Sequence, residues 1–109
     1  MGIWASITQL QGRTLRTLDH GKQFDILYVG DEHALIHIHS SGRDRTLWRR
    51  ELEGAFAELT VRGSISRSDI EEHHSPRNPA YVAAMLAATE GIVATRRPIV
   101  LLMGEVQRG

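Results

Sequence analysis

A long amphipathic helix is the strongest structural signal in this sequence of 109 residues. Between positions 48 and 62, apolar side chains recur at helical spacing and form one stripe. The stripe consists of Trp48, Leu52, Ala55, Phe56 and Leu59. Such a stripe has to be buried against other elements, so the rest of the chain is expected to pack around this helix. Gly63 is placed to end it, because glycine tolerates the positive φ of a helix terminus.

Two shorter helices are expected to follow. Ser66 and Asp69 have the spacing of a capping box, which predicts the start of the first one. Pro79 suits the first position of a helix, where its missing N–H costs nothing, so the third helix is expected over residues 79–90. An apolar, β-favouring segment over residues 92–103 then predicts a strand region.

The first half of the chain reads differently. Residues 1–11 place apolar side chains at helical spacing before Gly12, which predicts a short helix, with a strand as the alternative. β-favouring segments separated by turns fill residues 13–47 and predict an antiparallel meander. The strand around Ile36 is the clearest of them, because its side chains alternate strictly between apolar and polar.

These signals together predict an α+β fold, a small antiparallel β-meander with helices packed on one face. We expect one domain over residues 1–109, since a chain of this length buries one core and not two. The expected order is an N-terminal helix (1–11), a β-meander (13–47), three helices (48–90) and a C-terminal strand region (92–103).

The C-terminal half resembles a winged helix-turn-helix, and the run from Arg49 to Leu86 also resembles small bacterial or phage-type domains of unassigned function. The winged-helix resemblance implies nucleic-acid contacts at the start of the third helix, from Arg77 and Asn78, and at the wing, from Arg96 and Arg97. The third helix itself contains no basic residue. It offers few groups that can read base edges, so packing of the three helices as a core is the alternative.

Composition excludes several classes of protein. The chain has no cysteine, which excludes disulfides, thiol nucleophiles and cysteine zinc sites and fits a reducing cytoplasm. Thirteen basic and thirteen acidic residues give a net charge of zero, so binding to nucleic acid or to a membrane has to be local. We expect no membrane span and no secretory signal, and therefore a cytoplasmic protein.

An arginine cluster is the first candidate site. It surrounds a Ser-Ser-Gly turn and the start of the long helix, and consists of Arg43, Arg45, Arg49 and Arg50. Arginine forks beside free turn N–H groups and a helix N-terminus suit an anion or a phosphate. The alternative is a solvated turn in which these arginines pair with Asp44, Glu51 and Glu53.

His37 and His39 are the second candidate, because they point to the same face of one strand. Two imidazoles alone do not hold zinc, so we expect an exposed polar strand face and no metal site. No catalytic motif is present, and neither an enzyme nor a cofactor is expected.

The sequence therefore predicts a small non-catalytic binding module that contacts nucleic acid or another phosphate-bearing partner through the arginine cluster. The alternative is a protein-interaction or homodimerisation module that uses the alanine-rich third helix, whose outer face is unusually poor in charge.

Overall fold

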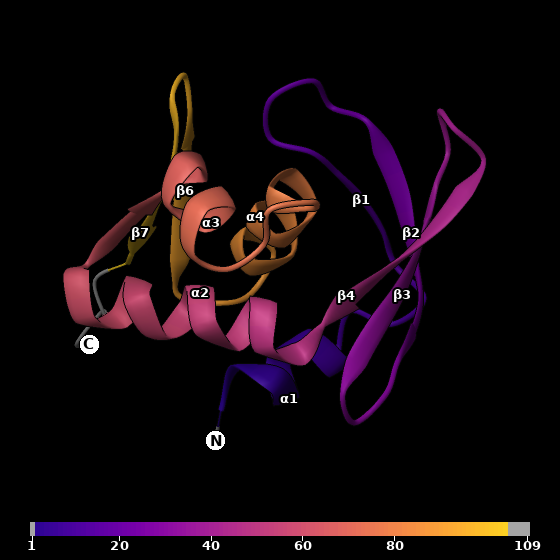
Figure 1. Cartoon of the computed structure of the whole chain (residues 1–109), viewed down its shortest axis with the longest axis horizontal. Coiled ribbons are helices and arrows are strands. Elements are labelled where there is room, and N and C mark those ends of the chain that lie inside the picture. Colours follow the sequence, from indigo (N-terminus) through magenta and orange to yellow (C-terminus); the bar gives the residue numbers. More distant parts are fainter. Residues whose placement is uncertain (1, 105–109) are drawn as a thin grey trace.

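The computed structural model describes residues 2–104 and confirms the α+β fold, with a four-stranded antiparallel meander and a second, smaller sheet (Figure 1). The first half contains one helix and the meander, in which neighbouring strands in the chain are neighbours in the sheet. These elements are α1 (Ile3–Thr8), β1 (Thr14–Arg16), β2 (Gln23–Val29), β3 (His33–Ile38) and β4 (Arg43–Trp48).

The second half holds three helices and a three-stranded sheet. Its elements are α2 (Arg49–Arg62), β5 (Ser64–Ser66), α3 (Arg67–His73), α4 (Pro79–Ala87), β6 (Ile92–Arg96) and β7 (Ile99–Met103). Strand β7 lies between β5 and β6 and is antiparallel to both. A short turn at Arg97 and Pro98 joins β6 to β7.

Three expected boundaries were wrong. Helix α1 ends at Thr8 and not at residue 11, because the chain turns and the Gly12 N–H donates to the Ile26 carbonyl of the meander, 2.7 Å away. Strand β5 interrupts the helical region, and the third helix ends at Ala87 instead of residue 90.

The predicted helix ends in the centre of the chain are confirmed. Gly63 ends α2 in the left-handed region with a φ of 82°. Ser66 caps α3 through a complete capping box, in which its hydroxyl accepts the Asp69 N–H at 3.1 Å and its own N–H donates to the Asp69 carboxylate at 3.0 Å. Both features fix the direction in which the chain leaves α2 and enters α3.

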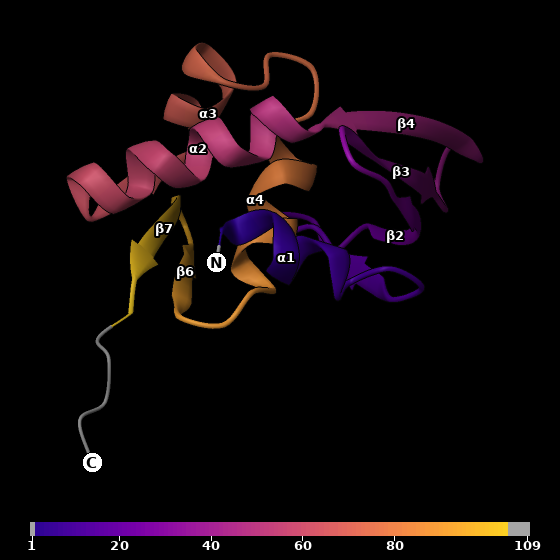
Figure 2. The same ribbon diagram turned by 90° about the horizontal axis from the view of Figure 1, so that it is seen from below.

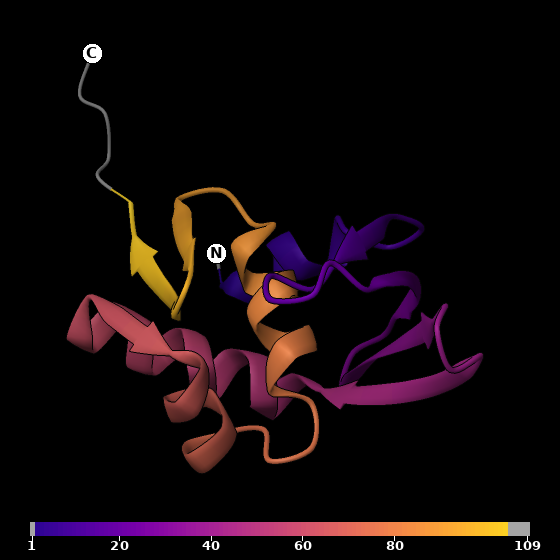
Figure 3. The same cartoon turned by 90° about the horizontal axis from the view of Figure 1, so that it is seen from above.

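Helix α4 lies between the two sheets and is the centre of the core (Figures 1 and 3). Its residues from Val82 to Leu86 are all buried, and the ring of Tyr81 meets the ring of Phe24 on β2 edge to face, with 5.1 Å between the centroids. The charge-poor surface of this helix is thus covered within the same chain, where α4 packs against α2, α3, β6 and β1. Ala83 and Ala84 are part of the core cluster.

The two halves are also joined by α1, which packs against α2 and faces the viewer in Figure 2. The indole N–H of Trp4 donates to the Gly30 carbonyl, 2.9 Å away, in the turn between β2 and β3. Helices α2, α3 and α4 lie on one side of the meander, as expected. Strand β4 runs directly into α2, so Arg49 and Arg50 lie where the two halves meet.

Candidate functional site

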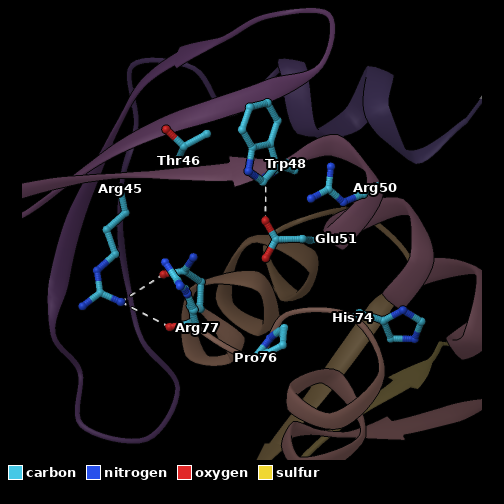
Figure 4. Close-up of a pocket in the computed structure, with 9 residues that line it drawn as sticks. Arg45, Thr46, Trp48, Arg50, Glu51, His74, Pro76 and Arg77 are labelled. Atoms are coloured by element: carbon cyan, nitrogen blue, oxygen red, sulfur yellow. Dashed lines mark hydrogen bonds between the residues drawn. The ribbon is translucent and has the colours of Figure 1, made fainter.

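A groove of about 850 Å³ opens where β4, the first turn of α2 and the loop between α3 and α4 meet (Figure 4). We call it the arginine groove. The side chains that give it its chemistry are Arg45, Trp48, Arg50, Glu51, Arg77 and Asn78. They come from segments that are up to 33 positions apart in the chain, so the groove exists only in the folded protein.

Glu51 forms the buried part of this groove, with 8% of its surface exposed. One carboxylate oxygen accepts the backbone N–H of Trp48 at 2.8 Å, drawn as a dashed line in Figure 4. The other accepts the hydroxyl of the buried Ser75 at 2.5 Å. Glu51 therefore ties the start of α2 to the loop before α4, and its oxygens are occupied by neutral donors instead of by an arginine.

Arg45 is held against the start of α4. Its Nη1 donates to the Arg77 carbonyl at 3.2 Å and to the Asn78 side-chain oxygen at 3.0 Å. Its guanidinium also lies 5.7 Å from the centre of the Tyr81 ring, within the range of a cation–π contact. These neutral partners orient the guanidinium but leave its positive charge without a counter-charge.

Arg50 and Arg77 complete the basic lining of the groove. The guanidinium of Arg50 lies 5.6 Å from the centre of the Trp48 ring. Within residues 2–104, the ion pairs that arginines make involve Arg49, Arg62 and Arg67, and none involves an arginine of the groove. The groove thus carries three arginine charges against the single carboxylate of Glu51.

The remaining candidate arginines lie elsewhere. Arg49 points away from the groove, since it pairs with Glu53 at 3.1 Å, donates to the Asp31 carbonyl and lies over the Trp4 ring. Arg43 is exposed at the far end of β4. Arg96 and Arg97 are exposed beside the turn between β6 and β7, and neither lines the arginine groove.

The expected neutralisation of the arginine cluster by its own acidic neighbours is found at one pair. Arg49 pairs with Glu53, but Asp44 pairs with His37 instead, at 2.7 Å, and Glu51 is engaged as described above. The acidic residues nearest in sequence are therefore taken up by other groups. This is why Arg45 and Arg50 keep their charge available.

Exposed rings extend from the groove across the outer face of the meander. Trp48 is 43% exposed and Tyr28 51% exposed, and the His33 ring lies between them, 5.8 Å from the first and 5.9 Å from the second. We call these three residues the aromatic stripe. Sequence reasoning missed it, because an irregularity in β2 between Ile26 and Tyr28 shifts the register that simple alternation would give.

His37 and His39 lie on the outer face of the meander with ring centres 6.3 Å apart. Each is paired with a different carboxylate, His37 with Asp44 and His39 with Asp25 at 2.9 Å. The set of metal-binding side chains that does converge was not expected from sequence. It consists of Glu58, His73 and His74, on α2 and at the end of α3.

Comparison with known proteins assigns no family. The chain matches no protein-family model, and it has no significant similarity to any curated protein or to any solved structure. The longest helix, α2, has 14 residues, and no helix within residues 2–104 is long and apolar enough to cross a lipid bilayer. The candidate site is thus defined by its own geometry.

Proposed function

We propose that this chain binds single-stranded nucleic acid in the arginine groove. Phosphates are held by Arg45, Arg50 and Arg77, and a base stacks on Trp48. The observation that carries the proposal is the convergence of three arginines without a carboxylate partner beside an exposed tryptophan. A basic groove combined with an aromatic platform is the usual composition of a site for single strands.

The phosphate part of the proposal depends on charge. Arginine offers a planar fork of N–H donors that matches the oxygens of a phosphate, and it stays protonated at any physiological pH. The three groove arginines exceed the one carboxylate by two charges, so the local potential is positive although the chain is neutral overall. The groove is therefore expected to attract a polyanion at low ionic strength.

The stacking part depends on the aromatic stripe. Bases of a single strand are unstacked and can lie against exposed rings, and this contact tolerates any base. Trp48 belongs to both the groove and the stripe. A strand with a phosphate near Arg50 can thus continue across His33 towards Tyr28.

A single strand is favoured over a duplex because of α4. In a helix-turn-helix protein the corresponding helix enters the major groove and reads bases. Here Tyr81 packs on Phe24, and the helix is buried between the sheets. Duplex readout by this helix would require the meander to detach. Recognition is expected to be weakly sequence-specific, since phosphate contacts carry no sequence information.

Burial also weighs against the alternative, a protein-interaction or homodimer surface on the alanine-rich helix. Such a surface would need Ala83 and Ala84, which are buried at 0% and 4% exposure. The arginine groove, in contrast, is open.

The test is a fluorescence-anisotropy titration of labelled oligothymidylate and oligouridylate at low salt. We expect the wild type to bind both, and the double variant R50A/R77A to bind about tenfold more weakly for each arginine lost. The variant R62A/R67A is the matched control, because it removes the same charge from arginines outside the groove. The proposal is overturned if the wild type does not bind, or if both double variants lose the same affinity.

A further inference from the structure

A second cluster of functional side chains adjoins the arginine groove, since one of its members, His74, also lines the groove. Oxygen Oε1 of Glu58 is 3.0 Å from Nδ1 of His73 and 2.8 Å from Nε2 of His74. The three donor atoms lie within 4.8 Å of one another. Two ring nitrogens are thus directed at one carboxylate oxygen.

The backbone positions these donors before any ligand arrives. Glu58 lies one helical turn after Gly54 on α2, and His74 is the C-cap residue of α3. A Cβ atom at Gly54 would be 2.8 Å from Nδ1 of His74, so the missing side chain lets the imidazole lie directly on the helix. His74 and Glu58 are only 17% and 18% exposed, which restricts their motion.

Hydrogen bonds hold both carboxylate oxygens of Glu58 in place. Arg62 binds the second oxygen, Oε2, at 2.6 Å and leaves Oε1 to the histidines. Asp69, 3.2 Å from Arg62, offsets the positive charge of that guanidinium. Metal-binding carboxylates are commonly oriented by such hydrogen bonds.

We propose that Glu58, His73 and His74 bind a divalent transition-metal ion, with zinc as the expected ion. Two imidazoles and one carboxylate are a common zinc donor set, and three protein donors leave one tetrahedral position for water or for a group of a partner. The imidazole nitrogens disfavour magnesium and calcium, which prefer oxygen donors. When the ion enters, the hydrogen on the ring nitrogen that faces Glu58 moves to the other nitrogen of the same imidazole, so that a nitrogen lone pair faces the ion.

His37 and His39 provide the internal comparison. They are as close in sequence as a chelating pair can be on a strand, but their nitrogens are directed at two different carboxylates, those of Asp44 and Asp25. Within residues 2–104, the only group of three or more donors that could hold a metal is Glu58, His73 and His74. A double variant at His37 and His39 therefore removes two imidazoles, as many as the cluster contains, and leaves the cluster itself unchanged.

The experiment is calorimetric titration of zinc chloride into the full chain after removal of metals with a chelator, together with thermal unfolding. We expect one zinc ion per chain and, at about 100 times the dissociation constant, a rise in Tm of roughly 10 °C. H73Q and E58Q should weaken binding by at least about tenfold, since even groups that only orient a ligand change affinity by that factor. H37Q/H39Q should bind zinc like the wild type, and magnesium should cause no shift.

His73 is 48% exposed, so H73Q is expected to fold, and the metal-free circular dichroism spectrum checks this. The proposal is overturned if the wild type does not bind one zinc ion, or if folded H73Q binds it with wild-type affinity. It is also overturned if H37Q/H39Q loses the site. Glu58 and His73 do not line the arginine groove, so failure of the metal proposal is distinguishable from failure of the nucleic-acid proposal.

Discussion

Two groups of arginines in this chain differ in whether their charges are paired with carboxylates. On the face formed by α2 and α3, Arg62 bridges Glu58 and Asp69 at 2.6 Å and 3.2 Å, and Arg67 pairs with Glu71 at 3.2 Å. In the arginine groove, Arg45 is held by neutral oxygens, and Arg50 lies over a tryptophan ring. The first group is neutralised within the fold, whereas the second keeps its charge.

The comparison shows why a net charge of zero does not describe this surface. Basic and acidic residues are equal in number along the sequence, but the fold pairs Arg62 and Arg67 with carboxylates and leaves the groove positive. Exposed ion pairs contribute little to stability, typically less than about 1 kcal/mol each. Unpaired arginines that converge, in contrast, create a local field that can attract a polyanion. We therefore expect the two groups to respond differently to mutation.

The largest effect is expected at the carboxylate of the groove, Glu51. The variant E51A should lose about 1–3 kcal/mol of unfolding free energy, because it leaves the Trp48 N–H and the Ser75 hydroxyl buried without an acceptor. Urea unfolding measures the loss. E53A, which removes the 40%-exposed partner of Arg49, should change stability by less than about 0.5 kcal/mol. Equal losses for the two variants would contradict the structural role of Glu51.

The next effect concerns Trp48, which links the groove to the aromatic stripe. W48A should weaken binding of a single strand by about 1–3 kcal/mol, or roughly 5- to 150-fold, because one base loses its stacking partner. Stability should change less than in E51A, since the ring is 43% exposed. W48F should bind with intermediate affinity. Wild-type affinity in W48A, measured by anisotropy, would remove base stacking from the proposal.

A smaller effect separates the two groups of arginines directly. R62A should lower the unfolding free energy by about 1 kcal/mol or less, as expected for a half-exposed residue that bridges two carboxylates, and should leave nucleic-acid affinity unchanged. R50A should weaken nucleic-acid binding and leave the unfolding free energy nearly unchanged. Both are measured with a chelator present, so that metal binding does not contribute. If R62A loses nucleic-acid binding and R50A does not, the assignment of nucleic-acid binding to the groove arginines is contradicted.

The smallest effect is a pH dependence at the start of α3. Hydrogen bonds from Ser66, and the nearby Arg62 charge, hold the pKa of Asp69 below its ordinary value of 3.8. A carboxylate with a lowered pKa stabilises the fold above that ordinary value and loses this contribution as the pH falls below it. Wild-type stability should therefore decline more steeply below about pH 4 than that of D69N. If urea unfolding shows that the unfolding free energies of the wild type and D69N fall equally at acid pH, this role of Asp69 is contradicted.

The local elements could be predicted from sequence because their signals are local. Gly63 and the pair Ser66 and Asp69 set helix ends through backbone geometry and capping, and the structure contains both. Strand β5 was missed because three residues are too few to show a periodicity. The start of α2 has no capping side chain at Trp48, since a tryptophan offers no oxygen, and the Glu51 carboxylate three residues further on accepts the Trp48 N–H instead.

The site was predictable only in part, since it depends on how distant segments meet. Arg45, Arg50, Arg77 and Asn78 were candidates for different reasons, and nothing in the sequence indicates that the α3–α4 loop meets β4. Arg96, at the end of β6, and Arg97, in the turn that follows, do not line the groove. His73 and His74, at the end of α3, contact Glu58, which lies 15 and 16 positions away, a separation that sequence spacing does not single out.

The most direct test of the central claim is the salt dependence of single-strand affinity. Each phosphate contact releases counterions, so log K should fall with log salt with a slope of about −0.7 per contact, or roughly −2 for the three groove arginines. R50A/R77A should reduce the magnitude of that slope by about 1.4, whereas R62A/R67A should leave it unchanged. A wild-type slope near zero, or an equal reduction in both variants, would contradict a phosphate-binding groove.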